Sequence, residues 1–80
     1  MTRTAHDVSI SCTYTVSPVA RWEALHADKT EGRPPLALEW LQCAQALEHA
    51  AGEPGLLAGR VAQLTDRAED ARYQARRAAR

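Results

Sequence analysis

The 80-residue chain has no phenylalanine, and two tryptophans and two tyrosines are its whole aromatic content. Any hydrophobic core must therefore be small and mainly aliphatic. The formal net charge is zero, which argues against a globally basic nucleic-acid binder. No apolar run approaches the ~20 residues of a membrane-spanning helix, and residues 1–10 lack the apolar segment of a secretory signal. We therefore expect a cytoplasmic protein with no membrane contact.

Cysteine is also scarce, with Cys12 and Cys43 as the two thiols. Without a secretory signal we expect both to be reduced. Each falls on the apolar face of its predicted element, which is typical of a buried structural thiol. The cysteines and the three histidines show no C-x-x-C or H-x-x-x-H spacing, so we expect no metal site and no cofactor.

Motifs for catalysis are missing too. The sequence has no glycine-rich phosphate loop and no nucleophile elbow. Cys43 and His49 lie six positions apart on one predicted helix, whereas facing residues are three or four apart. Asp66, Glu69 and Asp70 are interspersed with arginines and are expected to form exposed ion pairs along a helix. We predict that the protein is not an enzyme.

The clearest local pattern is the alternation over residues 7–17, DVSISCTYTVS. Apolar and hydroxyl side chains alternate strictly there, which predicts a half-buried β-strand. The apolar positions are Val8, Ile10, Cys12, Tyr14 and Val16. Nothing else in the sequence has the pattern of a strand, so the fold class expected is α+β, predominantly α.

Three helices are expected after the strand. Ser17 and Pro18 form a helix start, with serine as the cap and proline at the first helical position, and a short helix covers residues 18–27. Residues 28–35 are polar, end in two prolines and predict a loop. A helix over 35–51 would begin at Pro35 and stop at Gly52, and a third helix would cover 56–78.

The last two helices share an apolar pattern. Apolar residues recur at alternating spacings of four and three, as in a coiled coil, which predicts an antiparallel αα-hairpin within a single domain. These seam positions are Leu36, Trp40, Cys43, Leu47 and Ala50, then Leu57, Val61, Leu64, Ala68, Ala71, Ala75 and Ala78. Because alanine buries little area, the end of the third helix is expected to fray, to project as a charged tail, or to pack against something outside the hairpin.

A solitary strand leaves both of its edges unpaired. We therefore expect it to pair between chains, in a homodimer or with a partner's sheet, through Val8, Ile10, Cys12, Tyr14 and Val16. The alternative is an extended arm that packs on the chain's own helices.

Two further features could contact a partner. Trp22 on the short helix is either a partner anchor or part of the core. Arg72, Arg76, Arg77 and Arg80 follow one another without an acid between them, so they could contact phosphates or an acidic partner. The alternative is that these cations complement the helix dipole and keep an alanine-rich helix in solution.

In element order, residues 7–51 are similar to the ribbon-helix-helix DNA-binding proteins. In that family a two-stranded ribbon enters the major groove, so the resemblance implies a dimeric transcriptional repressor. The polar face of the strand departs from the pattern, because it carries serine and threonine where arginine, lysine, asparagine or glutamine would read bases.

The hypothesis we place first is therefore a non-enzymatic protein-interaction module, a small regulator or inhibitor of an unidentified partner complex. Nucleic acid is the second choice of partner. Nine arginines against one lysine, with abundant alanine, suggest a high-GC bacterial or phage genome, and small interaction proteins are frequent in phages and mobile elements.

Overall fold

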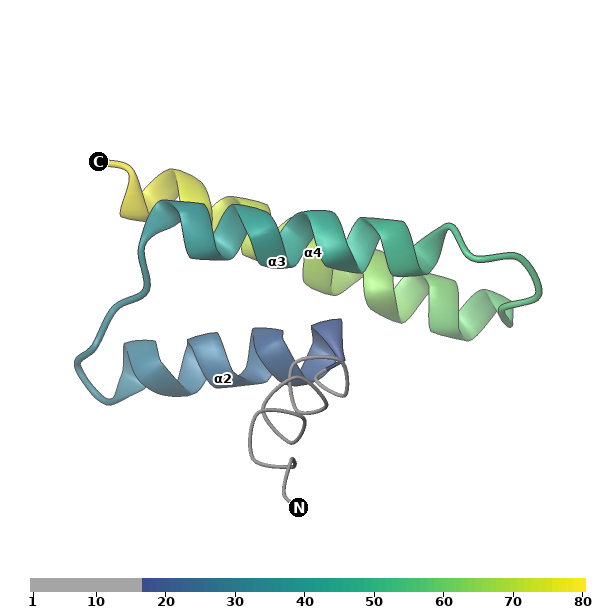
Figure 1. Ribbon diagram of the computed structural model, residues 1–80, viewed down its shortest axis with the longest axis horizontal. Coiled ribbons are helices and arrows are strands. Elements are labelled where there is room, and N and C mark those ends of the chain that lie inside the picture. The colour runs from purple at the N-terminus through teal and green to yellow at the C-terminus, as the bar shows by residue number, and fades with distance from the viewer. Residues whose placement is uncertain (1–16) are drawn as a thin grey trace, which may run out of the picture.

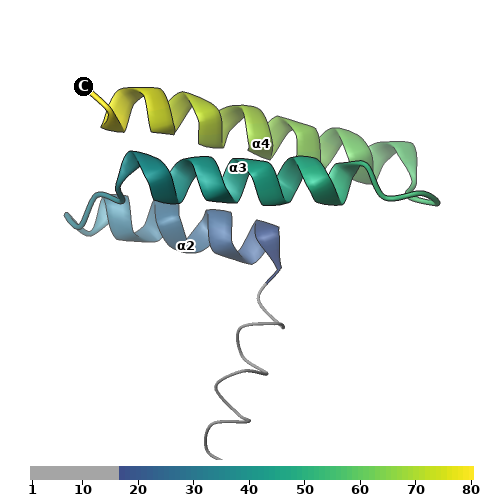
Figure 2. The same ribbon diagram turned by 45° about the horizontal axis from the view of Figure 1, so that its top comes forward.

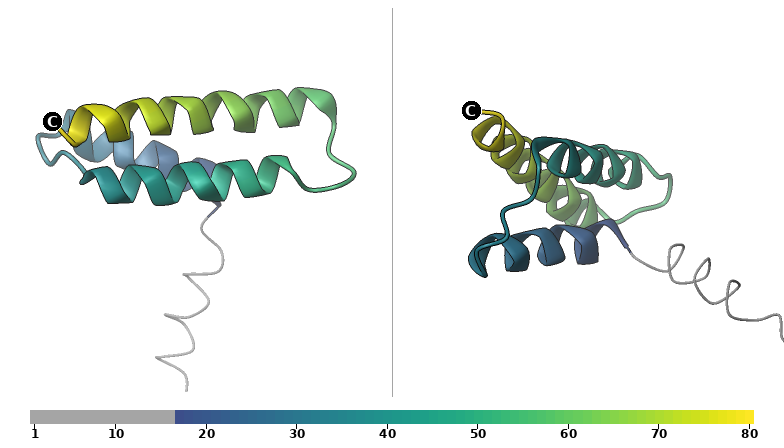
Figure 3. Two further views of the ribbon diagram at one scale, coloured as in Figure 1. Left: turned by 90° about the horizontal axis from the view of Figure 1, so that it is seen from above. Right: turned by 60° about the vertical axis from the view of Figure 1, so that its left-hand side comes forward.

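The computed structural model describes residues 17–80, which form three α-helices. They are α2 (Pro18–Thr30), α3 (Ala37–Ala51) and α4 (Ala58–Ala78). Helices α3 and α4 make the predicted antiparallel hairpin, and α2 runs beside it (Figures 1 and 2). Figure 3 shows α2 lying along one face of the hairpin, next to both other helices.

The predicted α+β fold class is wrong, because the described residues 17–80 contain helices and turns and no strand. The strand predicted over residues 7–17 lies outside the described residues except for Ser17, which is the N-cap of α2. The interface proposed for that strand lies outside them as well. Since α2 covers the hairpin, this part of the chain builds its core by helix-on-helix packing and needs no sheet.

The start of α2 is the one the sequence predicted. The Ser17 hydroxyl accepts a hydrogen bond of 3.0 Å from the Ala20 N–H, and Pro18 occupies the first helical turn, where its missing N–H costs nothing. The helix continues to Thr30, three residues beyond the predicted end. It is followed by Gly32, whose φ of +88° suits a residue without a side chain.

The start of α3 differs from the prediction. Pro35 is buried and precedes the helix, and Leu36 is the N-cap. The Leu36 N–H donates to a carboxylate oxygen of Glu39 at 2.9 Å, which is half of a capping box. The predicted stop is confirmed, since α3 ends at Ala51 and Gly52 is its C-cap. In the connection to α4, Gly55 has a φ of +87°.

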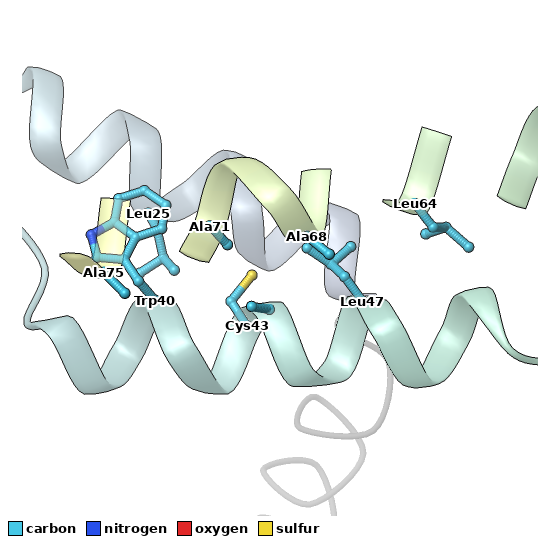
Figure 4. Packing of buried hydrophobic residues seen from close by; sticks show 9 residues of the cluster. Leu25, Trp40, Cys43, Leu47, Leu64, Ala68, Ala71 and Ala75 are labelled. Carbon is cyan, nitrogen blue, oxygen red and sulfur yellow. The ribbon is translucent and has the colours of Figure 1, made fainter. Parts of the chain in front are cut away.

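The core lies between the three helices (Figure 4). Small residues let α3 and α4 approach closely, while the His26 ring of α2 contacts the rings of Trp22 on α2 and Trp40 on α3. Its buried members are Leu25, Trp40, Cys43, Ala44, Leu47, Leu64, Ala68, Ala71 and Ala75. The middle of the predicted seam is therefore confirmed.

The first seam position predicted for each of the two helices is wrong, because neither side chain is buried. Leu36 is 70% exposed and Leu57 is 80% exposed. These residues are the N-caps of α3 and α4, with extended backbone at ψ 154° and 148°. The helical period does not extend to residues outside a helix, so their side chains turn away from the core.

The alanine part of the seam is also tighter than predicted. Ala71 is fully buried and Ala75 is 4% exposed, so the seam as far as Ala75 neither frays nor projects, whereas Ala78 is exposed. The buried part packs against α3 within the hairpin, and Leu25 of α2 completes the same core cluster. Helix α2 of the same chain therefore supplies the apolar contact that the seam alone lacks.

Candidate functional site

A polar cluster joins α2 to α4. Trp22 and His26 lie one turn apart on α2, and both reach the same carboxylate of Asp70 on α4. The Trp22 Nε1–H donates to Asp70 Oδ2 at 2.8 Å, and His26 Nε2 lies 2.6 Å from that oxygen. Gln74 donates to the other Asp70 oxygen at 3.4 Å and accepts from Lys29 Nζ at 2.9 Å. These five residues are called the polar cluster below.

Aromatic rings enclose the histidine of the polar cluster. The His26 ring makes edge-on contacts with Trp22 and Trp40, at centroid distances of 4.6 and 4.9 Å. The guanidinium of Arg67 covers the Trp22 ring at 5.1 Å, in cation–π geometry. Trp22 is thus half-buried, and its N–H already has a partner within the chain.

The contacts of Asp70 set its acidity. Partial burial raises the pKa of Asp70. The hydrogen bonds from His26, Trp22 and Gln74 together lower this pKa by more than burial raises it, so the pKa lies below its ordinary value. The expectation that Asp70 forms an exposed ion pair along its own helix is wrong, because its partly buried carboxylate contacts Trp22 and His26 of α2. The four-residue spacings of Trp22 with His26 and of Asp70 with Gln74 place each pair on one helix face, but they do not indicate that the two faces meet.

A histidine beside an aspartate is also two-thirds of a catalytic triad. Among the described residues, however, no serine, threonine or cysteine hydrogen-bonds to His26, and its ring is enclosed by tryptophans. The geometry therefore indicates that the polar cluster fastens α2 onto α4.

We expect Asp70→Asn to lower the free energy of unfolding by about 1 kcal/mol at pH 7, because it weakens the hydrogen bonds of the polar cluster. A carboxylate with a lowered pKa stabilises the fold above its unfolded pKa of about 3.9, and this contribution is lost as the pH falls through the folded pKa. Urea unfolding of wild type and variant should show that the difference between their free energies of unfolding is smaller at pH 3 than at pH 7. A difference that grows at pH 3 would contradict this role.

A second feature is a pocket lined by residues from the end of α2, the loop before α3, α3 and the end of α4. Figure 1 shows the C-terminal ends of α2 and α4 and the start of α3 at the same end of the molecule. Its volume is about 190 Å³. Two cationic side chains stand among apolar and amide neighbours in its lining, which consists of Lys29, Pro34, Pro35, Trp40, Gln74, Arg77 and Ala78. We call it the α4-terminal pocket.

The four C-terminal arginines singled out in the sequence do not act as one group. Arg72 pairs with Glu48 of α3 through two hydrogen bonds of 2.6 and 2.7 Å, which lower the pKa of Glu48. Arg77 lies over the Tyr73 ring at 5.7 Å, donates to its hydroxyl at 3.2 Å, and lines the pocket. Arg76 and Arg80 are exposed, with no acid of residues 17–80 within ion-pair distance.

Cys43 is buried beneath α2, where its Sγ lies 3.8 Å from the Pro18 carbonyl oxygen. Burial raises the pKa of this thiol, against a smaller opposing effect of Arg21. Over residues 17–80, no three histidine, cysteine or acidic side chains converge as metal ligands would. Within the same range, none of the helices combines the length and hydropathy needed to cross a bilayer.

Comparisons with protein-family models, with curated proteins and with solved structures found no match to this chain.

Proposed function

We propose that the protein is a non-enzymatic interaction module, a small regulator or inhibitor that binds a partner protein. Its contact surface would be the start of α3 together with the adjoining α4-terminal pocket. Helix α2, the hairpin and the polar cluster would form the frame that holds this surface in place.

The observation that carries the proposal is the exposure of two leucines at the start of α3, one at the N-cap and one in the first turn. Leu36 is 70% exposed and Leu38 is 61% exposed, although the core is complete without them. Single exposed leucines are common, but a group beside a pocket is typical of a contact surface. Pro34 and Pro35, directly before them, line the pocket. Leu57 is 80% exposed but lies at the start of α4, at the opposite end of the hairpin from these residues.

Because Leu38 lies beside the pocket and Leu57 lies at the other end of the hairpin, Leu38→Glu and Leu57→Glu form a matched pair of variants. The wild-type chain would first be used to capture partners from the cells that express it. Affinity for a purified partner would then be measured by calorimetry. We expect Leu38→Glu to weaken binding at least about tenfold, because a charge at the centre of an apolar contact must be desolvated. Leu57→Glu should leave the affinity unchanged.

Both substitutions are at exposed positions and should change the free energy of unfolding by no more than about 0.5 kcal/mol. Chemical denaturation of both variants checks this. Equal effects of the two variants on partner binding, or no effect of Leu38→Glu, would overturn the assignment of the contact surface.

A further inference from the structure

The geometry of the α4-terminal pocket points to a specific class of occupant. We propose that it receives one apolar side chain from an acidic segment of the partner, whose flanking carboxylates bind Lys29 and Arg77. This inference rests on the proposed function and names the chemistry that the contact surface would recognise.

The size of the pocket favours a single side chain. Sites that enclose a drug-sized ligand or a cofactor have volumes of about 300–1,000 Å³, and this pocket has about 190 Å³. Its walls include the rings of Pro34 and Pro35 and the methyl group of Ala78. A branched aliphatic side chain such as leucine suits walls of this kind, and its burial is favourable.

The charges at the rim favour carboxylates. Lys29 uses one donor on Gln74 and Arg77 uses one on Tyr73, so both keep N–H groups for a ligand. No acid of residues 17–80 pairs with either cation. The nearby acids Asp28 and Glu31 pair instead with Arg33, at 3.4 and 2.7 Å. This end of the molecule therefore presents positive charge next to an apolar pocket.

Nucleic acid would also bring negative charge, but the surface is poorly suited to it. Single-stranded nucleic acid binds mainly by stacking its bases on open aromatic rings. Trp40 is 2% exposed. Tyr73 is 47% exposed, but Arg77 lies over its ring, and Tyr73 is not part of the pocket lining. The one aromatic ring in the pocket lining is therefore buried, and the rest of the lining offers a base no flat ring, so an acidic peptide is the better match.

Three synthetic peptides with the central sequences Glu-Leu-Glu, Gln-Leu-Gln and Glu-Ala-Glu test the proposal. Each would be titrated into the ¹⁵N-labelled full chain, and a thymidine oligonucleotide would be titrated in parallel. We expect Glu-Leu-Glu to shift the amide signals of Lys29, Leu36, Arg77 and Ala78 at millimolar concentrations or below. The other two peptides should bind at least about tenfold more weakly, because each lacks one of the two recognised features.

Charge-removing variants give a second readout. Lys29→Gln combined with Arg77→Gln should weaken Glu-Leu-Glu binding at least about tenfold and remove its salt dependence. The matched control is Arg60→Gln, an exposed arginine in the first turn of α4, at the other end of that helix. It should leave the affinity unchanged.

Equal binding of the three peptides, no shifts at the pocket, or tighter binding of the oligonucleotide there would overturn the proposal. These failures can be told apart from failure of the proposed function. If Leu38→Glu abolishes partner binding while no peptide binds the pocket, the proposed function is supported and the proposed occupant of the pocket is wrong. If the peptides bind as expected but Leu38→Glu leaves partner binding intact, the leucine surface is wrong.

Discussion

Replacing Trp40 with alanine is expected to lower the free energy of unfolding by about 3–5 kcal/mol, the usual cost of removing a large aromatic side chain from a core. Trp40 is 2% exposed and is among the largest fully enclosed side chains. It belongs to the same cluster as Leu25 and Ala75 and contacts the His26 ring. Its loss would leave a cavity at the point where all three helices meet (Figure 4).

A loss of this size should leave much of the chain unfolded, since domains as small as this one lie toward the low end of the usual 5–15 kcal/mol. Urea titrations followed by far-ultraviolet circular dichroism would measure it without relying on tryptophan fluorescence. Leu38→Ala, at an exposed position on the same helix, is the control and should cost about 0.5 kcal/mol or less. A cost below about 1 kcal/mol for Trp40→Ala would mean that α2 does not close the core over this ring.

The hairpin could be predicted from the sequence because its signals are local. The middle of the apolar seam and the stop at Gly52 each depend on residues within a few positions of one another, and the structure confirms them. The Ser17–Pro18 start of α2 is local in the same way and is also confirmed. What could not be predicted is which element covers the hairpin. Trp22 and Asp70 are 48 positions apart in sequence, and no periodicity within one helix indicates such a pair.

The error in fold class comes from the alternation over residues 7–17. It predicted a solitary strand, whose unpaired edges were expected to pair with a second chain. Residues 17–80 instead build their core from three helices, and Ala71 and Ala75 are buried without a second chain. Dimer formation through Val8–Val16 stays a prediction about residues outside the described part.

The candidate site was only partly accessible to sequence reasoning. Arg77 was predicted as a contact for an acidic partner, and it lines the pocket. Arg72 was placed in the same group, but it pairs with Glu48 across the hairpin. The pocket itself is assembled from α2, the loop before α3 and the end of α4, so no single stretch of sequence encodes it.

The close approach of α3 and α4 predicts an unusual response at Ala71. Replacing Ala71 with leucine adds apolar surface, and leucine is nearly as good a helix former as alanine. We nevertheless expect the free energy of unfolding to fall by about 1–3 kcal/mol, because Ala71 is fully buried and a larger side chain must force the helices apart.

Ala62→Leu is the matched control, since Ala62 lies on the exposed side of the same helix, and it should change stability by no more than about 0.5 kcal/mol. The sign of the effect at Ala71 separates the two interpretations of the alanine seam. If the seam were loosely packed and awaited an outside partner, leucine would fill empty space and stabilise the chain. A loss of stability at Ala71, with none at Ala62, would show that the small side chains are what bring α3 and α4 together.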